Sequence, residues 1–527
     1  MSAESPVSAE SAVSRESAVS PESAVSPESP VRPESRVRAW WQARSRGERI
    51  LLALVLAHLG IKLVVYLQIA QGQLVGDESS YVNGGKALSN VLRDAVTFSA
   101  PDWAEVERNV VSSGWFMPGM AMLLTPLYLV VPDADVAVLR GYLGIVTSLV
   151  FLATVLRVHR SLGVVYAGAL LVLPGLVPVW AAFSMAAWGD LFAGILVVLL
   201  IVELVELSRV LRRGEAPTLG QGARLGLVAI AVVYFRSSAS LLVAGLGVVA
   251  LVAAIALLRG AERRRAVLSA GLGALTFVGL LVPWSLAASS SLGGTVMTTT
   301  SVPTVLANTF GDRDQVCFGP CDPGSTAWFS PLRYSRETAR ATGLSEMDVA
   351  DQMSAYARQD VTASSYASDV LDNLEAYVRH PERFYSYLRP DTDPDRPHDA
   401  VVDVVTRGMV WGAFAIGVAL LLGVVRRRRE DQVVSVLLTL SLGALLTQPF
   451  VHIAGPRYWT TAAPVLGLAA AMLLGQVLLR RTSGDEAEVA VGERDVALGT
   501  WLTRVQVLLA LGAVLAAIGV WVLASAG

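Results

Sequence analysis

Apolar stretches of membrane-spanning length recur along the whole chain. The first runs roughly from Ile50 to Ala70, and about 20 such residues suffice to cross a hydrocarbon core of about 30 Å. Further apolar segments lie at 115–131, 136–156, 163–182, 187–207, 224–258, 267–287, 408–425, 432–453, 457–479 and 503–524. Hydrophobic residues make up 53% of the 527 residues and charged residues only 16%, which excludes an ordinary soluble protein. The sequence therefore predicts an all-α polytopic membrane protein with about 11–12 transmembrane helices.

Arginine clusters beside the apolar segments set the expected orientation. They crowd the start of the first segment and recur at 209–213, 259–265, 426–429 and 480–481. The positive-inside rule assigns all of them to the cytoplasm, but they cannot share one side if every segment is a full crossing. Placing both long polar loops outside requires an odd number of crossings before residue 287. The stretch 224–258 is interrupted by Arg236-Ser237-Ser238 and reads as either a short hairpin or one broken span.

Polar stretches divide the chain into four parts. Residues 1–47 form a tail in which a Ser-, Glu-, Pro- and Val-rich hexad repeats six times; without an apolar face or a signal-peptide core, we expect it to be disordered and cytoplasmic. The other parts are an N-terminal transmembrane module at 48–287 with an acidic first outer loop at 71–114, an extracytoplasmic loop domain at 288–405, and C-terminal transmembrane helices at 406–527. Because only two of the 42 basic residues are lysines, the composition indicates a GC-rich bacterial gene, and we expect a multi-pass protein of the bacterial cytoplasmic membrane.

The two cysteines, Cys317 and Cys321, lie close together in the expected extracytoplasmic loop, where a disulfide can persist. A metal site there is less favoured, because no other His or Cys completes a four-ligand set. No P-loop, Rossmann glycine fingerprint or nucleophile elbow stands in a convincing context, so a nucleotide-dependent reaction is not expected.

Two adjacent acids follow the first span directly, in Gly76-Asp77-Glu78-Ser79-Ser80-Tyr81. A charge at bilayer depth costs roughly 2.5 kcal/mol or more, so this pair is either a solvated marker of the helix end or a functional site. In the transfer of a sugar from a polyprenyl phosphate to a hydroxyl, one carboxylate removes the hydroxyl proton while cations stabilise the departing phosphate. Adjacent helical residues point about 100° apart. We therefore predict Asp77 as the base, Glu78 as an orienting or binding residue, and Tyr81 as a substrate-binding residue.

Candidate phosphate-binding cations are spread over several segments. Arg236 stands inside an apolar stretch, where a charge needs a partner or a water-filled cavity. Arg457 and Tyr458 lie at the mouth of a span, where both residue types also serve as interfacial anchors, and Lys86 equally suits a solvated or headgroup-contacting face. The full set of candidate cations is Lys86, Arg93, Arg236, Arg313, Arg336 and Arg457.

The order of these features resembles bacterial GT-C membrane glycosyltransferases. The features are the first span, the Gly-Asp-Glu-x-x-Tyr sequence, the aromatic and Pro/Gly segment from Trp115 to Gly119, and Pro456-Arg457-Tyr458 before a Pro-containing apolar span. More narrowly, the chain resembles the branch related to protein O-mannosyltransferases and aminoarabinose transferases. Arg379-His380-Pro381-Glu382-Arg383-Phe384 is similar to a His/Asn-Pro-x-x-Phe/Tyr segment common in such proteins. The likeness covers most of residues 48–480.

This resemblance implies catalysis by the first-loop acid, which maps to Asp77 and Glu78, and a second acid at the outer end of a later span, matched by Asp190. It also implies a polyprenyl-phosphate sugar donor and inversion at the anomeric carbon. The family often carries His-Pro-Pro where the chain returns to the membrane; this chain has Phe116-Met117-Pro118-Gly119 instead, which puts any histidine role there in doubt. The acceptor hydroxyl, of a glycan, a lipid or a protein, stays open. So does a divalent cation near Asp77, because carboxylates of this kind bind such ions or act without them.

Two functions of other classes fit the same features. A transporter or flippase of polyprenyl-linked lipids also needs many spans and intramembrane charge, and a noncatalytic scaffold for envelope assembly needs only the spans. The chain has no pair of matching halves of the kind many transporters show, and its outer loop is large, so we favour the enzyme. The clusters of arginine beside apolar runs give no indication of a nucleic-acid partner.

Overall fold

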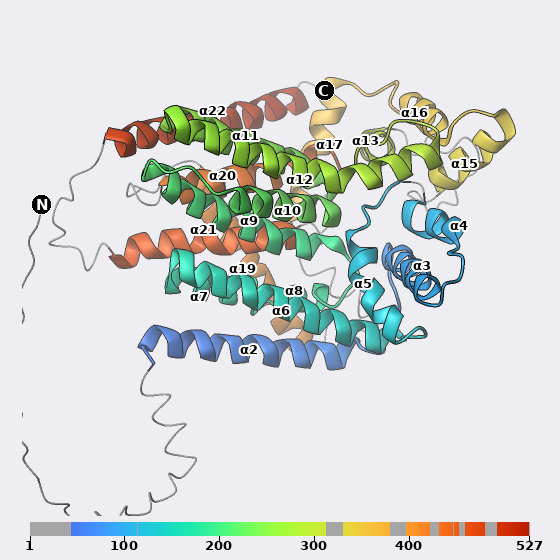
Figure 1. The fold of residues 1–527 in the computed structure, drawn as a ribbon, viewed down its shortest axis with the longest axis horizontal. Helices are drawn as coiled ribbons and strands as arrows, with labels where there is room; N and C mark the ends of the chain where they lie inside the picture. Colours follow the sequence, from blue (N-terminus) through green and yellow to red (C-terminus); the bar gives the residue numbers. More distant parts are fainter. Residues whose placement is uncertain are drawn as a thin grey trace, which may run out of the picture. The chain divides into compact units, whose positions relative to one another are not determined.

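The computed structural model describes residues 44–112, 114–311, 330–379, 397–421, 432–445, 447–452, 459–479 and 493–525. The chain divides into two compact units, Met1–Arg49 and Ile50–Gly527. In the described part of the first unit, the Ser45 backbone N–H donates to the Glu48 carboxylate (2.9 Å) at the start of a helix. The second unit is a bundle of apolar helices that carries shorter helices at one of its ends (Figure 1).

The regular elements within these residues are all helical. In chain order they are α2 (Arg46–Ile69), α3 (Glu78–Val96), α4 (Trp103–Val106), η1 (Glu107–Val111), α5 (Gly119–Val130), α6 (Val136–Leu162), α7 (Val164–Val172), α8 (Pro178–Phe183), α9 (Gly189–Arg212), α10 (Leu219–Phe235), η2 (Ser237–Ala239), α11 (Ser240–Leu257), α12 (Gly260–Leu292), α13 (Ser301–Phe310), α15 (Ser330–Thr342), α16 (Glu346–Ala357), α17 (Ala363–Arg379), α19 (Pro397–Leu421), α20 (Gln432–Leu445), η4 (Gln448–Phe450), α21 (Trp459–Leu479) and α22 (Glu493–Ser525). Eight of the described helices are long and apolar enough to cross a membrane, and three further apolar helices are shorter. The prediction of an all-α polytopic membrane protein is confirmed.

The ambiguous stretch 224–258 forms a helical hairpin. Its first helix, α10, runs antiparallel to α9, because Gly189 abuts Phe235 at one end and Arg224 pairs with Glu203 further along. The chain then turns through η2, and α11 returns beside α9, where its residues from Leu246 to Leu257 share a cavity with the second half of α9. The turn places Arg236 at the end of the bundle rather than in the middle of a span.

Two segments that are as apolar as the spans do not form single long helices. The segment near 115–131 gives the short helix α5, which packs along the amphipathic helix α3. A Cβ at Gly85 of α3 would lie 2.8 Å from Leu124 of α5, so a glycine is needed for this close approach. The segment near 163–182 is split into α7 and α8. Since α5 begins beside the α10 turn and leads directly into the first turn of α6, both of its ends lie at the same end of the bundle, and α5 is not a crossing.

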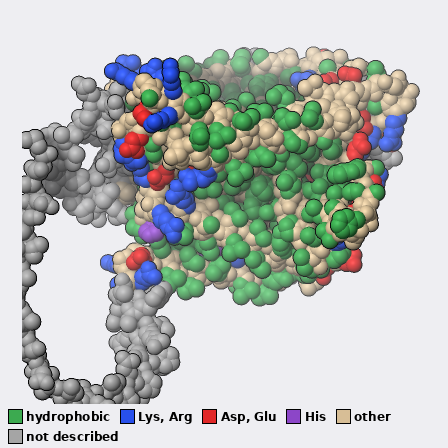
Figure 2. Space-filling model, viewed as in Figure 1, with side chains coloured by type: hydrophobic (Ala, Val, Ile, Leu, Met, Phe, Trp, Pro, Cys, Tyr) green, Lys and Arg blue, Asp and Glu red, His purple; other side chains and the backbone are tan. Residues whose placement is uncertain are grey.

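The two polar loops meet at that end. The Thr300 backbone N–H donates to the Gly114 carbonyl (3.0 Å), and the Ser291 hydroxyl donates to Glu107 of η1 (2.7 Å). The second polar loop also contacts the segment after α20, because the Tyr366 hydroxyl of α17 donates to the Phe450 carbonyl (2.8 Å). Figure 2 shows acidic side chains with a few basic ones at this end, and a larger concentration of Lys and Arg side chains at the opposite end. We refer to the first as the loop end and to the second as the basic end.

Candidate functional site

The acidic pair of the first loop is placed at the N-terminus of α3, and its two members have different surroundings. Glu78 is completely buried, whereas Asp77 is half-buried. The Glu78 carboxylate forms a two-pronged ion pair with Arg140 of α6, in which Nη2 lies 2.7 Å from Oε2 and Nη1 contacts Oε1. Arg140 is itself 1% exposed. The pair is thus sealed from solvent on both sides.

Backbone groups complete the surroundings of this ion pair. The Ala187 N–H donates to Glu78 Oε1 (2.7 Å) and the Val75 N–H to Oε2 (3.0 Å). Arg140 in turn donates to the carbonyls of Met185 (3.0 Å) and Gln73 (3.2 Å). Each of these contacts gives the buried ion pair a hydrogen-bond partner. The pair therefore joins the first loop, the first turns of α6 and the connection between α8 and α9 into one fixed unit.

Sequence reasoning did not single out Arg140. A signal was present, because Arg140 is a lone arginine within the apolar segment 136–156, and such residues usually have a specific partner. The same signal applies to Lys62 of α2, which is 5% exposed. Its ammonium group donates to Thr147 Oγ1 (2.7 Å), Ser148 Oγ (2.9 Å) and the Gly144 carbonyl (3.0 Å) of α6, one to two turns after Arg140.

The predicted acid Asp190 and the predicted cation Arg236 form a second ion pair at the loop end. Asp190 lies in the first turn of α9, and Arg236 lies in the turn after α10. Nη1 of Arg236 contacts Oδ1 of Asp190, and the two side chains are 12% and 10% exposed. Arg236 also donates through Nε to the Ser238 hydroxyl (2.9 Å) and through Nη2 to Gln448 Oε1 (3.1 Å). Gln448, in the loop after α20, is a third member of this group that the sequence did not indicate.

Close backbone packing holds the α9 and α10 ends together around this second pair. Gly189 lies directly against the Phe235 carbonyl, with no room for a side chain. The rings of Phe192 and Phe235 stack with their centroids 5.0 Å apart and 18° between their planes. Asp190 and Arg236 are thus fixed by their backbones as well as by their charges.

The two ion pairs are connected through short stretches of chain. Ala187, which donates to Glu78, precedes Asp190 by only three residues. The aromatic segment predicted to return to the membrane joins them, because the ring of Phe116 lies 5.0 Å from that of Tyr81 and Gly119 abuts the Tyr234 carbonyl. The structure therefore brings Asp77, Glu78, Tyr81, Asp190 and Arg236 to the same end of the bundle.

Other predicted cations lie apart from this group. Lys86 is nine residues along α3 from Asp77, about 13 Å at the rise of an α-helix, and its ammonium group lies 5.3 Å from the centre of the Tyr128 ring. Arg93, further along α3, donates to the Tyr128 carbonyl. Arg336 pairs with Glu346 (3.1 Å) in the helices at 330–357. The predicted residues Arg313, Arg457, Tyr458, Cys317 and Cys321, and the segment from His380 to Phe384, lie outside the described residues.

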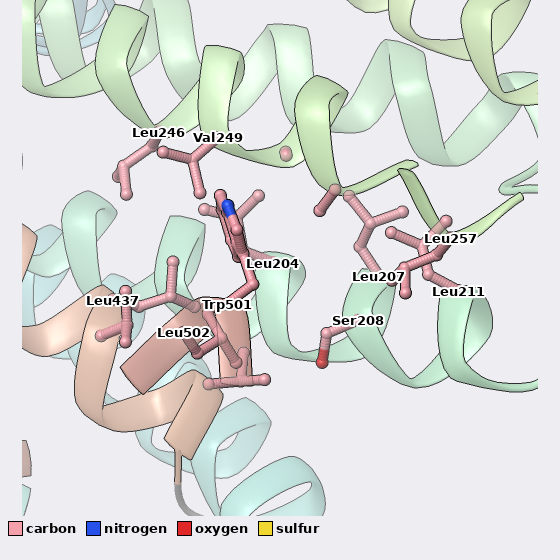
Figure 3. A pocket seen from close by; sticks show the side chains of 14 residues that line it. Leu204, Leu207, Ser208, Leu211, Leu246, Val249, Leu257, Leu437, Trp501 and Leu502 are labelled. Carbon is pink, nitrogen blue, oxygen red and sulfur yellow. The ribbon is translucent and has the colours of Figure 1, made fainter. Parts of the chain in front are cut away.

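Two further features concern ligands. Within the described part of the chain, no group of three or more His, Cys, Asp or Glu side chains is arranged to hold a metal ion. A small apolar cavity of about 50 Å³ lies between α9, α11, α20 and α22, lined by residues such as Leu207, Leu257 and Trp501 (Figure 3). It is formed by the basic-end half of α9, and no ionisable side chain lines it, so it is separate from the acids and cations of the loop end.

Comparison with solved structures finds a likeness to the oligosaccharyltransferase of Archaeoglobus fulgidus in its apo form. The identity is 12% and the TM-score 0.45, and the matched region covers 89% of this chain and 56% of that protein. This chain thus spans a little over half the length of the archaeal protein. No family model and no curated protein matches the sequence. The function proposed below rests on the residues of the loop end.

Proposed function

We propose that this protein is a GT-C-type membrane glycosyltransferase that moves a sugar from a polyprenyl-phosphate donor to a hydroxyl acceptor outside the cytoplasm. The observation that carries the proposal is the convergence, at one end of an apolar bundle, of a half-buried carboxylate with a fixed, mostly buried arginine. These are the two groups that such a transfer needs: a base for the hydroxyl proton and a cation for the departing phosphate. The bacterial cytoplasmic membrane, with the loop end outside, is part of the proposal.

Asp77 is the base in this reaction. The acceptor oxygen attacks the anomeric carbon from the side opposite the phosphate, the bond between that carbon and the phosphate oxygen breaks, and the hydroxyl proton passes to the Asp77 carboxylate. Polyprenyl phosphate leaves and the configuration is inverted. Asp77 suits the role better than Glu78 because it is partly accessible, whereas Glu78 is sealed by Arg140 and two backbone N–H groups. We therefore assign Glu78 to positioning the loop that carries Asp77.

Arg236 is the cation that stabilises the departing phosphate. Its guanidinium group is oriented from two sides by Asp190 and Gln448, and a guanidinium fixed in this way binds phosphate oxygens with defined geometry. Tyr81 lies beside the Asp77 loop on the ring of Phe116 and is placed to contact the sugar. Arg457 and Tyr458 remain predicted contributors to donor binding, and Lys86, on the outer helix α3, is a predicted contact for the acceptor or for lipid headgroups.

The test is donor turnover by the purified full-length protein in lipid nanodiscs with a panel of polyprenyl-phosphate sugars. We expect at least one donor to be consumed, and we expect Asp77→Asn to lower the turnover about 10²–10⁴-fold while donor binding survives. Asp133→Asn is the matched control, since Asp133 is an exposed acid of the neighbouring loop before α6.

Three results separate the alternatives. Full activity in Asp77→Asn would remove Asp77 as the base. Movement of the lipid between leaflets without any sugar product would identify a flippase instead, and no effect of the wild-type protein on any donor, alongside intact envelope assembly in Asp77→Asn cells, would favour a scaffold.

A further inference from the structure

The corner between α3 and α4 exposes large apolar side chains. Val96 is 76% exposed, Phe98 97% and Trp103 65%. Leu92, one turn earlier on α3, is also exposed. Polar residues normally occupy such a corner when it faces water, so a run of exposed aliphatic and aromatic side chains here needs an explanation.

The backbone at Phe98 makes this exposure more unusual. Its φ angle is +56°, in the left-handed region that bulky residues rarely adopt and that glycine adopts without cost. The Ser99 N–H donates to the Asp94 carbonyl (2.8 Å) and the Phe98 N–H to the Ala95 carbonyl (3.4 Å), which is the pattern of a helix end where glycine commonly stands. A phenylalanine at such a position, with its ring outside the protein, is explained if the ring is buried in something other than this chain.

The corner adjoins an apolar helix of the bundle. Arg93 ties the last turn of α3 to the last turn of α5 through the Tyr128 carbonyl. Apolar side chains are also exposed at Val130, where α5 ends, and at Ile145 and Leu149 of α6, and a spanning helix turns such residues toward lipid. Aromatic side chains favour the boundary between lipid headgroups and hydrocarbon.

We propose that Phe98, with Val96 and Trp103, inserts into the lipid leaflet at the loop end and anchors α3 to the membrane surface. The partner is the boundary between headgroups and acyl chains of the bilayer itself. Since α3 begins next to Asp77, this anchor holds the far end of the helix whose first residues belong to the candidate site. The insertion is independent of any activity in sugar transfer.

The depth of Trp103 tests this directly. The full-length protein is placed in nanodiscs whose lipids carry bromine either close to the glycerol backbone or at the middle of the acyl chains, and tryptophan fluorescence is recorded. Because the chain has 12 tryptophans, the contribution of Trp103 is taken as the difference between wild type and Trp103→Phe. Trp411→Phe is the control, since Trp411 lies near the middle of the apolar helix α19 and is 48% exposed.

We expect the Trp103 contribution to be quenched more strongly by the shallow bromines, and the Trp411 contribution more strongly by the deep ones. If neither lipid quenches Trp103, the corner lies in water and the proposal is wrong. The same pattern for Trp103 and Trp411 would also overturn it, because the corner would then lie at the depth of the spanning helices.

Phe98→Gly supplies a second measurement, on a variant that we expect to fold as well as wild type. Glycine suits the backbone at this position, so the variant should unfold at the same temperature as wild type or a higher one in detergent. In nanodiscs we expect it to lose most of the Trp103 quenching by shallow bromines while the Trp411 contribution is unchanged. Ser99→Gly is the matched control and should change neither. Retention of Trp103 quenching in Phe98→Gly would show that the Phe98 ring does not hold the corner in the leaflet.

Discussion

The two ends of the bundle both contain buried carboxylates paired with arginine, but they use them differently. At the loop end, Glu78 and its partner Arg140 are both at most 1% exposed. At the basic end, Glu203 of α9 is 5% exposed, while its partners Arg157 and Arg224 are 33% and 48% exposed. An arginine that reaches solvent can be rehydrated when its partner is removed, whereas a sealed charge cannot. The comparison indicates that the loop-end pair fixes geometry, and that the basic-end pairs lie at the boundary between the bundle and its polar surroundings.

Removing the arginine of the loop-end pair should produce the largest effect. Arg140→Met leaves the Glu78 carboxylate buried without its cation, a change that costs about 3–5 kcal/mol. We expect a large fall in the unfolding temperature of the protein in detergent, together with loss of any donor turnover. The double variant Glu78→Gln with Arg140→Met should recover part of the stability, because it removes the stranded charge.

The control for this experiment is Arg213→Met, since Arg213 is 59% exposed and pairs with Glu215, which is 60% exposed. A fall in unfolding temperature as small as that of Arg213→Met would contradict the distinction between the two ends. A double variant no more stable than Arg140→Met would show that the loss arises from packing rather than from the stranded charge.

Part of the fold was predictable from the sequence, and part of it was not. Hydropathy identifies the apolar segments, because a span needs a continuous run of about 20 apolar residues, and the helices follow these runs. Hydropathy alone does not show whether an apolar segment crosses the membrane. The residues 115–131 are as apolar as a span, yet they form α5 against α3, since Gly84 and Gly85 allow that close packing.

The candidate site residues were selected from the sequence on different grounds. Asp77 follows the first span directly, Arg236 interrupts an apolar stretch, and Asp190 was matched through the family resemblance. The structure brings all three to the loop end, and their roles stay predictions. Arg140 stands out in the sequence as a lone arginine in an apolar segment, but its partner could not be predicted, because it is 62 residues away and a pairing over that separation is decided by the tertiary fold. Gln448 was missed for the same reason, being 212 residues from Arg236.

A smaller effect is expected for the second loop-end pair, which is slightly open to solvent. Asp190→Asn keeps an oxygen that can accept a hydrogen bond from Arg236 but removes the compensating charge, and we expect a loss of about 1.5–3 kcal/mol in the free energy of unfolding. Under the proposed function, Arg236 should then hold the donor phosphate less well, so the KM for the donor should rise more than kcat falls.

Gln448→Leu sharpens this test, because it removes a neutral partner of the same guanidinium group. We expect the same direction of change in KM with a smaller loss of stability. If Asp190→Asn changed stability but left the KM for the donor as in wild type, the pair would be structural, and Arg236 would lose its assigned role.

The smallest effect is expected at the basic end, from Glu203→Gln. The substitution removes the buried member of the network, and the arginines that remain, Arg157 and Arg224, can both turn toward solvent or lipid headgroups. No charge is stranded, so the cost should be within about 1 kcal/mol, as for exposed ion pairs. The unfolding temperature in nanodiscs, compared with that of Arg140→Met under identical conditions, measures the contrast. A cost as large as that of Arg140→Met would mean that Glu203, Arg157 and Arg224 form a sealed network in the membrane. The ion pairs at the two ends of the bundle would then be of the same kind.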